Sequence, residues 1–279
     1  MRSCVFNLLL VTVAIAGCGA SAVGAPATWR RVVLVELFTS QGCSSCPPAD
    51  AFVRDLPALG FGRDRVVPLT FHVDYWDDLG WKDPFATAVF TDRQRAYARS
   101  RTLRSPDGQA GIDGIYTPQM IVDGLVHLSG QRRQDAIREM ERAAMRPPLF
   151  DLVADATPHG STIDVAVTAT ERGPTRSTPG WHVVVALAAT RTRTAVARGE
   201  NAGATLDEAA VVRALSDRIP LARGPRSTVT VRLTKPADLP WAGIEVVAFV
   251  QSRATGEVGA VAVTRPDPEQ NAGNQRPRP

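Results

Sequence analysis

Two cysteines separated by two residues stand in the segment FTSQGCSSCPPAD, residues 38–50. Cys43 and Cys46 follow the apolar run VVLVELF, which has the length and β-branched composition of a buried strand. Two thiols at this spacing can exchange disulfides, bind a metal ion, or remain closed as a cross-link. The pair is therefore a candidate redox centre, a candidate metal site or a structural disulfide.

The first 25 residues have the features of an export signal. A single positive residue precedes an apolar stretch that is too short to be a stable membrane anchor. Cys18 ends the segment IAGC, which resembles a lipoprotein box and implies acylation of that cysteine after cleavage. Ordinary cleavage after Ala22 or Ala25 is the alternative. The first outcome predicts a membrane-anchored lipoprotein, and the second predicts a periplasmic or secreted protein.

Export places the cysteines in an oxidising compartment. Of the four cysteines, Cys4 lies in the discarded signal, and Cys18 is either discarded or acylated. Cys43 and Cys46 are then the two cysteines of the folded body. They can pair with each other, with another molecule or with a ligand.

The composition of the 279 residues is that of a globular protein, with 44% hydrophobic and 22% charged residues. The net charge of +4 is spread along the chain without a basic tract, so nucleic-acid binding is not expected. The sequence contains no nucleotide-binding loop, so no organic cofactor is expected.

The order of expected elements is β-α-β-α-β-β-α over residues 29–146, which predicts an α/β domain. The hairpin is expected to turn tightly at Asp123-Gly124. The segments concerned are a strand at 32–38, a helix at 47–59, a strand at 66–75, a helix at 85–101, a hairpin at 119–130 and a helix at 134–145.

Beyond Arg146-Pro147-Pro148 the pattern changes to short alternating strands separated by turns, over residues 149–264. This pattern predicts a second, all-β domain that resembles a sandwich. A more irregular segment, 197–217, interrupts the strands and is expected to hold a short helix or a long loop. Residues 265–279 have no large apolar side chain and are expected to be disordered.

In a redox centre, Cys43 would attack and Cys46 would resolve the mixed disulfide, provided that the first sulfur is exposed. Main-chain N–H groups at a helix start stabilise a thiolate. Pro47 and Pro48 favour a helix that begins late, with Cys46 near its cap and Pro47 as its first residue. This position would move Cys43 off the helix end and weaken its thiolate.

The CxxC pair, the element order and the segment IYTP before the hairpin resemble the thioredoxin superfamily. That resemblance implies a thioredoxin-like fold for residues 29–146, with Pro118 as a cis-proline and Thr117 binding the backbone of a substrate. Four longer motifs resemble a bacterial exported family catalogued as domain-of-unknown-function family 1223; they are VELFTSQGCSSCPPAD, FHVDYWDDLGWKDPF, YTPQMIVDG and RGENAGATL. That family implies a thioredoxin-like domain with a second domain attached and no established reaction.

Three further side chains are candidates for the same site. Glu36 is similar to the buried acid of thioredoxins but lies one residue further from the first cysteine; it is either a proton relay or the partner of an arginine. Trp76 and Trp81 lie in an aromatic, acidic segment. They either cover the sulfurs as a substrate wall or anchor a long loop to the core.

The function predicted from these residues is thiol–disulfide exchange with protein thiols outside the cytoplasm, together with a redox partner. Two alternatives remain. The cysteines with His72 and Met120 could hold a soft ion such as Cu(I), although no closed metal site is expected because the other histidines are scattered. The pair could also be a structural disulfide in a binding module, although so small a loop contributes little stability.

Overall fold

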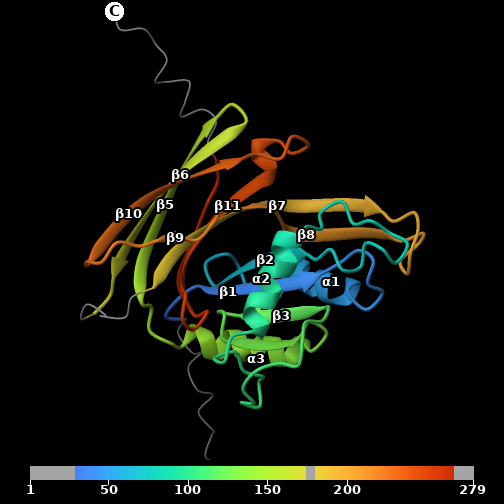
Figure 1. The fold of residues 1–279 in the computed structure, drawn as a ribbon, viewed down its shortest axis with the longest axis horizontal. Helices are drawn as coiled ribbons and strands as arrows, with labels where there is room; N and C mark the ends of the chain where they lie inside the picture. The colour runs from blue at the N-terminus through green and yellow to red at the C-terminus, as the bar shows by residue number, and fades with distance from the viewer. Residues whose placement is uncertain (1–28, 174–179, 267–279) are drawn as a thin grey trace, which may run out of the picture.

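The computed structural model describes residues 29–173 and 180–266 (Figure 1). The predicted export signal with Cys18, and all but the first two residues of the predicted disordered tail, lie outside the described residues. No helix in the described ranges is both long and apolar enough to cross a membrane.

The elements expected before residue 146 are present in the expected order. They are β1 (Val33–Thr39), α1 (Pro47–Asp55), β2 (Val66–His72), α2 (Ala88–Ala98), β3 (Gln119–Val122), β4 (Val126–Ser129) and α3 (Arg133–Ala144). Helix α1 begins at Pro47 and has Cys46 as its N-cap, which confirms the late start. The tight turn at Asp123-Gly124 is also confirmed, since both residues have positive φ.

The second half consists mainly of strands. They are β5 (Phe150–His159), β6 (Thr162–Glu171), β7 (Trp181–Ala195), β8 (Thr205–Leu215), β9 (Ile219–Pro220), β10 (Arg226–Thr234), β11 (Ile244–Ser252) and β12 (Val258–Thr264), with a short 3-10 helix at Trp241–Gly243. The segment 197–217, expected to be a short helix or long loop, is mostly strand β8.

The predicted fold class is wrong. Strands from both halves of the chain form one mixed nine-stranded sheet, in the order β12-β11-β7-β8-β2-β1-β3-β4, with β9 beside β7. Strand β8 lies parallel to β2, with Thr70 opposite Val211, and it joins the two halves. The molecule is therefore mostly β with three α-helices in the described residues, rather than a thioredoxin-like α/β domain followed by a separate sandwich.

The large sheet is covered on both faces (Figure 1). One face packs under α2, in a core that combines side chains of both halves such as Phe38, Phe71 and Phe249. On the opposite face, α1 and α3 cover β1, β3 and β4. A second sheet, in the order β10-β6-β5, covers β7 and β11 through the cluster of Val165, Val185 and neighbours.

The β3–β4 turn also connects the two halves. Asp123 is buried and forms ion pairs with Arg31 and Arg146. Gly124 has φ +71°, and a Cβ atom placed on it would lie 1.9 Å from the carbonyl oxygen of Gly256 in the β11–β12 turn. Two backbone segments from different halves of the chain therefore meet at a distance that only glycine permits.

This contact predicts that Gly124→Ala destabilises the protein more than a substitution that changes backbone conformation alone. Gly160 in the β5–β6 turn is the matched control, because its φ is +60° and nothing lies within 4 Å of an added Cβ. We expect a loss of ~1 kcal/mol for Gly160→Ala and ~3 kcal/mol or more for Gly124→Ala. Urea unfolding measures the free energy of unfolding of both variants. Equal losses would show that the β3–β4 and β11–β12 turns are not in close contact.

Candidate functional site at the Cys43–Cys46 disulfide

Cys43 and Cys46 form a disulfide with each other. The chain enters it from the end of β1 through a turn in which the Cys43 N–H donates to the carbonyl of Ser40 at 3.2 Å. Ser44 and Ser45, between the cysteines, are exposed, but both cysteines are completely buried. The expectation that the first cysteine is exposed is therefore wrong for this closed form.

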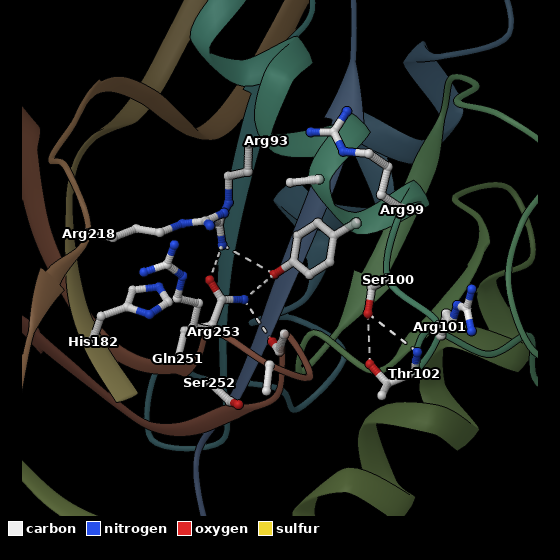
Figure 2. A pocket seen from close by; sticks show the side chains of 14 residues that line it. Arg93, Arg99, Ser100, Arg101, Thr102, His182, Arg218, Gln251, Ser252 and Arg253 are labelled. Carbon is white, nitrogen blue, oxygen red and sulfur yellow. Dashed lines mark hydrogen bonds between the residues drawn. The ribbon is translucent and has the colours of Figure 1, made fainter. Parts of the chain in front are cut away.

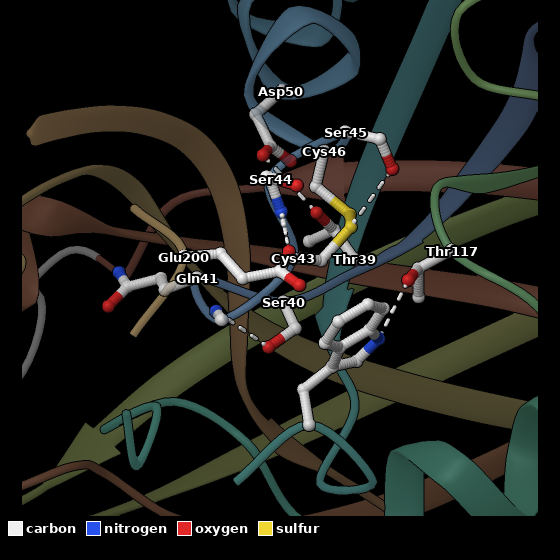
Figure 3. The surroundings of a disulfide bond; sticks show 12 residues. Thr39, Ser40, Gln41, Cys43, Ser44, Ser45, Cys46, Asp50, Thr117 and Glu200 are labelled. Carbon is white, nitrogen blue, oxygen red and sulfur yellow. Dashed lines mark hydrogen bonds between the residues drawn. A yellow bond between two sulfur atoms is a disulfide. The ribbon is translucent and has the colours of Figure 1, made fainter. Parts of the chain in front are cut away.

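The loop that joins β7 to β8 covers the disulfide turn. Asn201 donates from Nδ2 to the carbonyl of Cys43 at 3.0 Å and to that of Gln41 at 2.9 Å. Glu200 accepts the Ser44 N–H at 2.9 Å, a bond that is exposed to solvent. Figure 3 shows Glu200 beside Ser44 at the disulfide. A segment more than 150 residues away in the chain thus closes the CxxC turn.

The aromatic loop after β2 forms a second wall. Trp76 donates its indole N–H to Thr117 Oγ1 at 2.8 Å, and Trp81 donates to Gln41 Oε1 at 3.2 Å. The Thr117–Pro118 bond is cis, as the resemblance implied. A Cβ placed on Gly130 would contact both Ala49 and Pro118, at 2.8 and 3.2 Å, so Pro118 lies beside the first turn of α1.

Glu36 is not part of this wall. Side chains alternate between the two faces along β1, and this places Glu36 on the face covered by α2. Helix α1 and the disulfide turn lie on the opposite face. Glu36 pairs with Arg93 at 2.5 Å and accepts a hydrogen bond from Tyr97. The ion pair with an arginine is the second of the two roles that the sequence left open.

The acid beside the disulfide is Asp50, in the first turn of α1. Thr39 donates its hydroxyl to Asp50 Oδ2 at 3.2 Å, and Oδ1 is buried without a hydrogen-bond partner. Figure 3 shows Thr39 and Asp50 next to the two sulfur atoms. Burial raises the pKa of the Asp50 carboxyl to about 8, and the charge of Glu208 adds to that rise. Asp50 therefore holds a proton at neutral pH.

Behind Asp50 lies a buried network of charged groups. His72 Nδ1 is 2.7 Å from Asp83 Oδ2, which also accepts the Gln41 N–H at 2.8 Å. On its other side, His72 Nε2 is 3.6 Å from Glu208 Oε1, and neither atom has a hydrogen-bond partner. Gln41 Nε2 donates to the second oxygen of Glu208 at 2.8 Å. Gln41 thus links the network to the turn that carries Cys43.

These contacts set the protonation of the network. Burial alone would lower the pKa of His72, but the carboxylates of Asp83 and Glu208 outweigh it and raise this pKa to about 9. Burial alone would raise the pKa of Asp83, but the positive charge of His72 holds it below its usual value. At neutral pH the network therefore contains an imidazolium paired with a carboxylate, beside the protonated Asp50.

The metal ligands considered for the cysteine pair do not come together. His72 is held between two carboxylates, and Met120 packs in the core beneath α1 and α3. Within residues 29–173 and 180–266, no three His, Cys, Asp or Glu side chains are arranged to hold a metal ion.

Asp50, Glu208 and Asn201 were not predicted as site residues. Asp50 has a sequence signal, because it lies four residues after Cys46 and shares a helix face with buried Ala49 and Val53. The others come from the segment expected to be irregular, and only the pairing of β8 with β2 brings them to the disulfide.

The fold and the site define a mostly β protein in which a buried CxxC disulfide lies beside buried acidic side chains. The chain belongs to the family described as "Protein of unknown function (DUF1223)", whose model matches residues 34–251. No curated protein matches the sequence.

Two of the solved structures that match this chain differ widely in their likeness to it. Protein AGR_C_4864 from Agrobacterium tumefaciens has 24% sequence identity and a TM-score of 0.58, with 85% of this chain and 96% of that chain covered. The likeness shows the fold alone. A domain of the outer membrane lipoprotein Omp28 from Porphyromonas gingivalis has 15% identity and a TM-score of 0.31, covering 43% of this chain and 89% of that chain. So low a score supports no structural conclusion.

The buried acids predict how stability depends on pH. The pKa of Asp50 is about 8 in the folded protein, against an ordinary value of 3.8, so the folded state binds more protons between these values. The free energy of unfolding therefore falls as the pH rises from about 4 to about 8. His72, with its pKa raised from 6.5 to about 9, extends this fall to higher pH.

Asp50→Asn keeps the shape of the protonated acid but cannot ionise. We expect its free energy of unfolding to decline less than that of the wild type between pH 5 and 8, as measured by urea denaturation at pH 5, 6.5 and 8. Asp64→Asn, on the exposed segment before β2, is the control and should follow the wild-type profile. Parallel profiles for Asp50→Asn and the wild type would mean that Asp50 is already ionised in the folded protein.

Proposed function

We propose that this protein exchanges thiols and disulfides through Cys43 and Cys46, and that the form described is its closed, oxidised state. The observation that carries the proposal is the buried, protonated Asp50 beside the disulfide. A buried disulfide that serves only as a cross-link needs no acid next to it. A disulfide that opens needs a proton for the sulfur that leaves.

The energetic cost of the buried network supports a functional role. Buried polar atoms without hydrogen bonds and buried charges reduce stability unless they are fully paired. Asp50 Oδ1, His72 Nε2 and Glu208 Oε1 all lack a hydrogen-bond partner. Titratable groups with shifted pKa values beside a reactive bond are typical of functional sites.

The proposed step begins with a thiolate on a partner protein, which attacks Cys43 Sγ. The partner sulfur forms a new bond to Cys43, the Cys43–Cys46 bond breaks, and its electron pair stays on Cys46 Sγ. Thr39 turns its hydroxyl from Asp50 to that sulfur and gives it a proton, and Asp50 replaces the proton on Thr39 Oγ1 and becomes a carboxylate. Pro47 and Pro48 have no N–H group, so the start of α1 offers fewer backbone donors to stabilise a thiolate on Cys46. A side-chain acid, Asp50, stabilises the leaving sulfur by protonating it through Thr39 instead.

The reverse step completes the exchange. The Asp50 carboxylate takes the proton back, and the Cys46 thiolate attacks Cys43 in the mixed disulfide. The partner leaves as a thiolate, and the Cys43–Cys46 bond forms again. Oxidation and reduction balance, because one disulfide is exchanged for another at each step.

Attack requires the covering loop to move, because both sulfurs are buried. The bonds that hold the loop over the turn come from Glu200 and Asn201, and the first is exposed to water. Their loss would uncover the turn around Ser44 without disturbing the sheet. Thr117 and Pro118, with Trp76 bonded to Thr117 and Trp81 bonded to Gln41, would then receive the backbone of the partner.

The partners we propose are protein thiols or disulfides outside the cytoplasm, together with a protein that restores the redox state. This part rests on the export signal expected in residues 1–25. Acylation of Cys18 would in addition hold the protein at a membrane surface.

The loop predicts a gated reaction. Glu200→Gln with Asn201→Ala weakens the cover, so we expect dithiothreitol to reduce the native disulfide at least tenfold faster than in the wild type, as measured by thiol alkylation and mass spectrometry. Arg193→Gln, on an exposed position of β7 near the same hairpin, is the control and should leave the rate unchanged. Equal rates for all three proteins would show that this loop does not control access.

A second candidate function is a binding module with a permanently closed disulfide, and the complete burial of both cysteines favours it. Equilibration with dithiothreitol redox buffers separates the two. Exchange activity predicts a midpoint potential above about −300 mV, with Asp50→Asn slowing exchange and sparing the fold. A pair that stays closed well below that potential contradicts exchange and supports the module.

A further inference from the structure

A cavity of about 430 Å³ lies on the face of the large sheet that α2 covers. Its walls come from α2, the segment after it, the start of β7, the β8–β9 turn and the β11–β12 turn (Figure 2). No Asp or Glu lines it, and its charged lining is basic: Arg93, Arg99, Arg101, Arg218, Arg253 and His182. A concave site of this size suits a small molecule.

The positive charge of the cavity is largely uncompensated. Arg93 is paired with Glu36 beneath the floor. Arg218 and Arg253 are exposed at the mouth and form no ion pair with any described residue. Partial burial lowers the pKa of Arg218, and the positive charges of Arg93 and Arg253 lower it further, while Tyr97 and Glu36 act in the opposite direction. Such crowding raises the free energy of the empty site, and a bound anion relieves it.

His182 adds a different polar group to the base of the cavity. Its side chain is 4% exposed, and its Nε2 atom is buried without a hydrogen-bond partner. The ring forms a hydrogen bond with the backbone of Gly180 that favours the charged ring. A bond that the ring donates to a carbonyl oxygen has this effect. Burial and the neighbouring arginines nevertheless lower the pKa of His182 to about 4. At neutral pH Nε2 is therefore a bare acceptor that lacks a donor.

Figure 2 shows Arg218 and Arg253, from different turns, reaching toward Arg93 and His182. Two free guanidinium groups offer N–H donors to the oxygens of an anion, and His182 offers an acceptor. Orthophosphate satisfies both demands near pH 7, because it carries negative oxygens and keeps a P–OH group, whereas a phosphate monoester, with a second pKa of about 6, is mostly a dianion without one. Sulfate has the same shape and charge but carries no proton, and ionised carboxylates carry none either.

We propose that this cavity binds orthophosphate, with Arg218 and Arg253 holding its oxygens and His182 Nε2 accepting a hydrogen bond from its P–OH group. The site is separate from the disulfide and does not depend on the proposed exchange activity. It also gives a reason for the Glu36–Arg93–Tyr97 network, which forms a fixed floor beneath the anion.

The test is calorimetric titration of the folded, full chain with orthophosphate, sulfate and citrate at pH 7 and constant ionic strength. We expect saturable binding of orthophosphate at least tenfold tighter than that of sulfate or citrate. Sulfate or citrate binding as tight as orthophosphate would overturn the assignment to phosphate. Absence of saturable orthophosphate binding would overturn the site altogether.

Variants locate the binding. Arg218→Gln with Arg253→Gln should weaken orthophosphate binding at least tenfold, and because both side chains are exposed the fold should tolerate the change. Arg138→Gln with Arg193→Gln removes the same charge from α3 and the far end of β7 and should change the affinity less than twofold. Equal weakening in both pairs would mean that net charge, and not this cavity, attracts the anion.

Discussion

The placement of β8 beside β2 is the contact on which the rest of the molecule depends. It converts two halves of the chain into one sheet and positions Glu208 next to His72 at the end of β2. The same strand continues the hairpin whose loop lies over Cys43. The disulfide, its cover and its buried acids are therefore assembled from both halves. Neither half contains the site alone, and the core beneath α2 likewise needs side chains from both.

The large sheet separates two environments. On the side of α1, a protonated acid and a network of one imidazolium and its carboxylates surround a disulfide, where proton transfer is the chemistry that the groups allow. On the side of α2, arginines surround a cavity, and among the described residues only Arg93 of this lining has an acidic partner, so anion binding is the chemistry that they allow. Glu36 and Asp50 illustrate the difference. Glu36 is tied to a guanidinium, while Asp50 has no cation bonded to it and stays protonated.

Much of the local structure could be predicted from the sequence. Apolar runs, proline positions and the Asp123-Gly124 turn gave the elements up to residue 146, including the late start of α1. Proline geometry is a local constraint, so a local pattern suffices to locate that helix. The sequence left three outcomes open for the two cysteines, and the structure has the first of them, a disulfide between Cys43 and Cys46.

The fold class could not be predicted because β8 has a misleading composition. Its sequence TLDEAAVVRAL holds two acids and several alanines, which favour helix or loop by themselves. Its strand conformation comes from pairing with β7 and β2, a tertiary effect that overrides local preference. Because β8 is not expected from the sequence, Glu208 and the β7–β8 loop over Cys43 are not expected at the site either. The acid that the sequence suggests as a proton relay is Glu36, but β1 directs its side chain to the opposite face of the sheet.

The central claim is that Asp50 and the Cys43–Cys46 bond are coupled, so that a change in one alters the other. The most direct measurement is the pKa of the Asp50 carboxyl, followed by carbon NMR in the oxidised and in the reduced protein. The account predicts a pKa near 8 in the oxidised form and a value at least about one unit different after reduction, because the Cys46 sulfur then carries or shares the proton. An Asp50 pKa that is the same in both forms would contradict it.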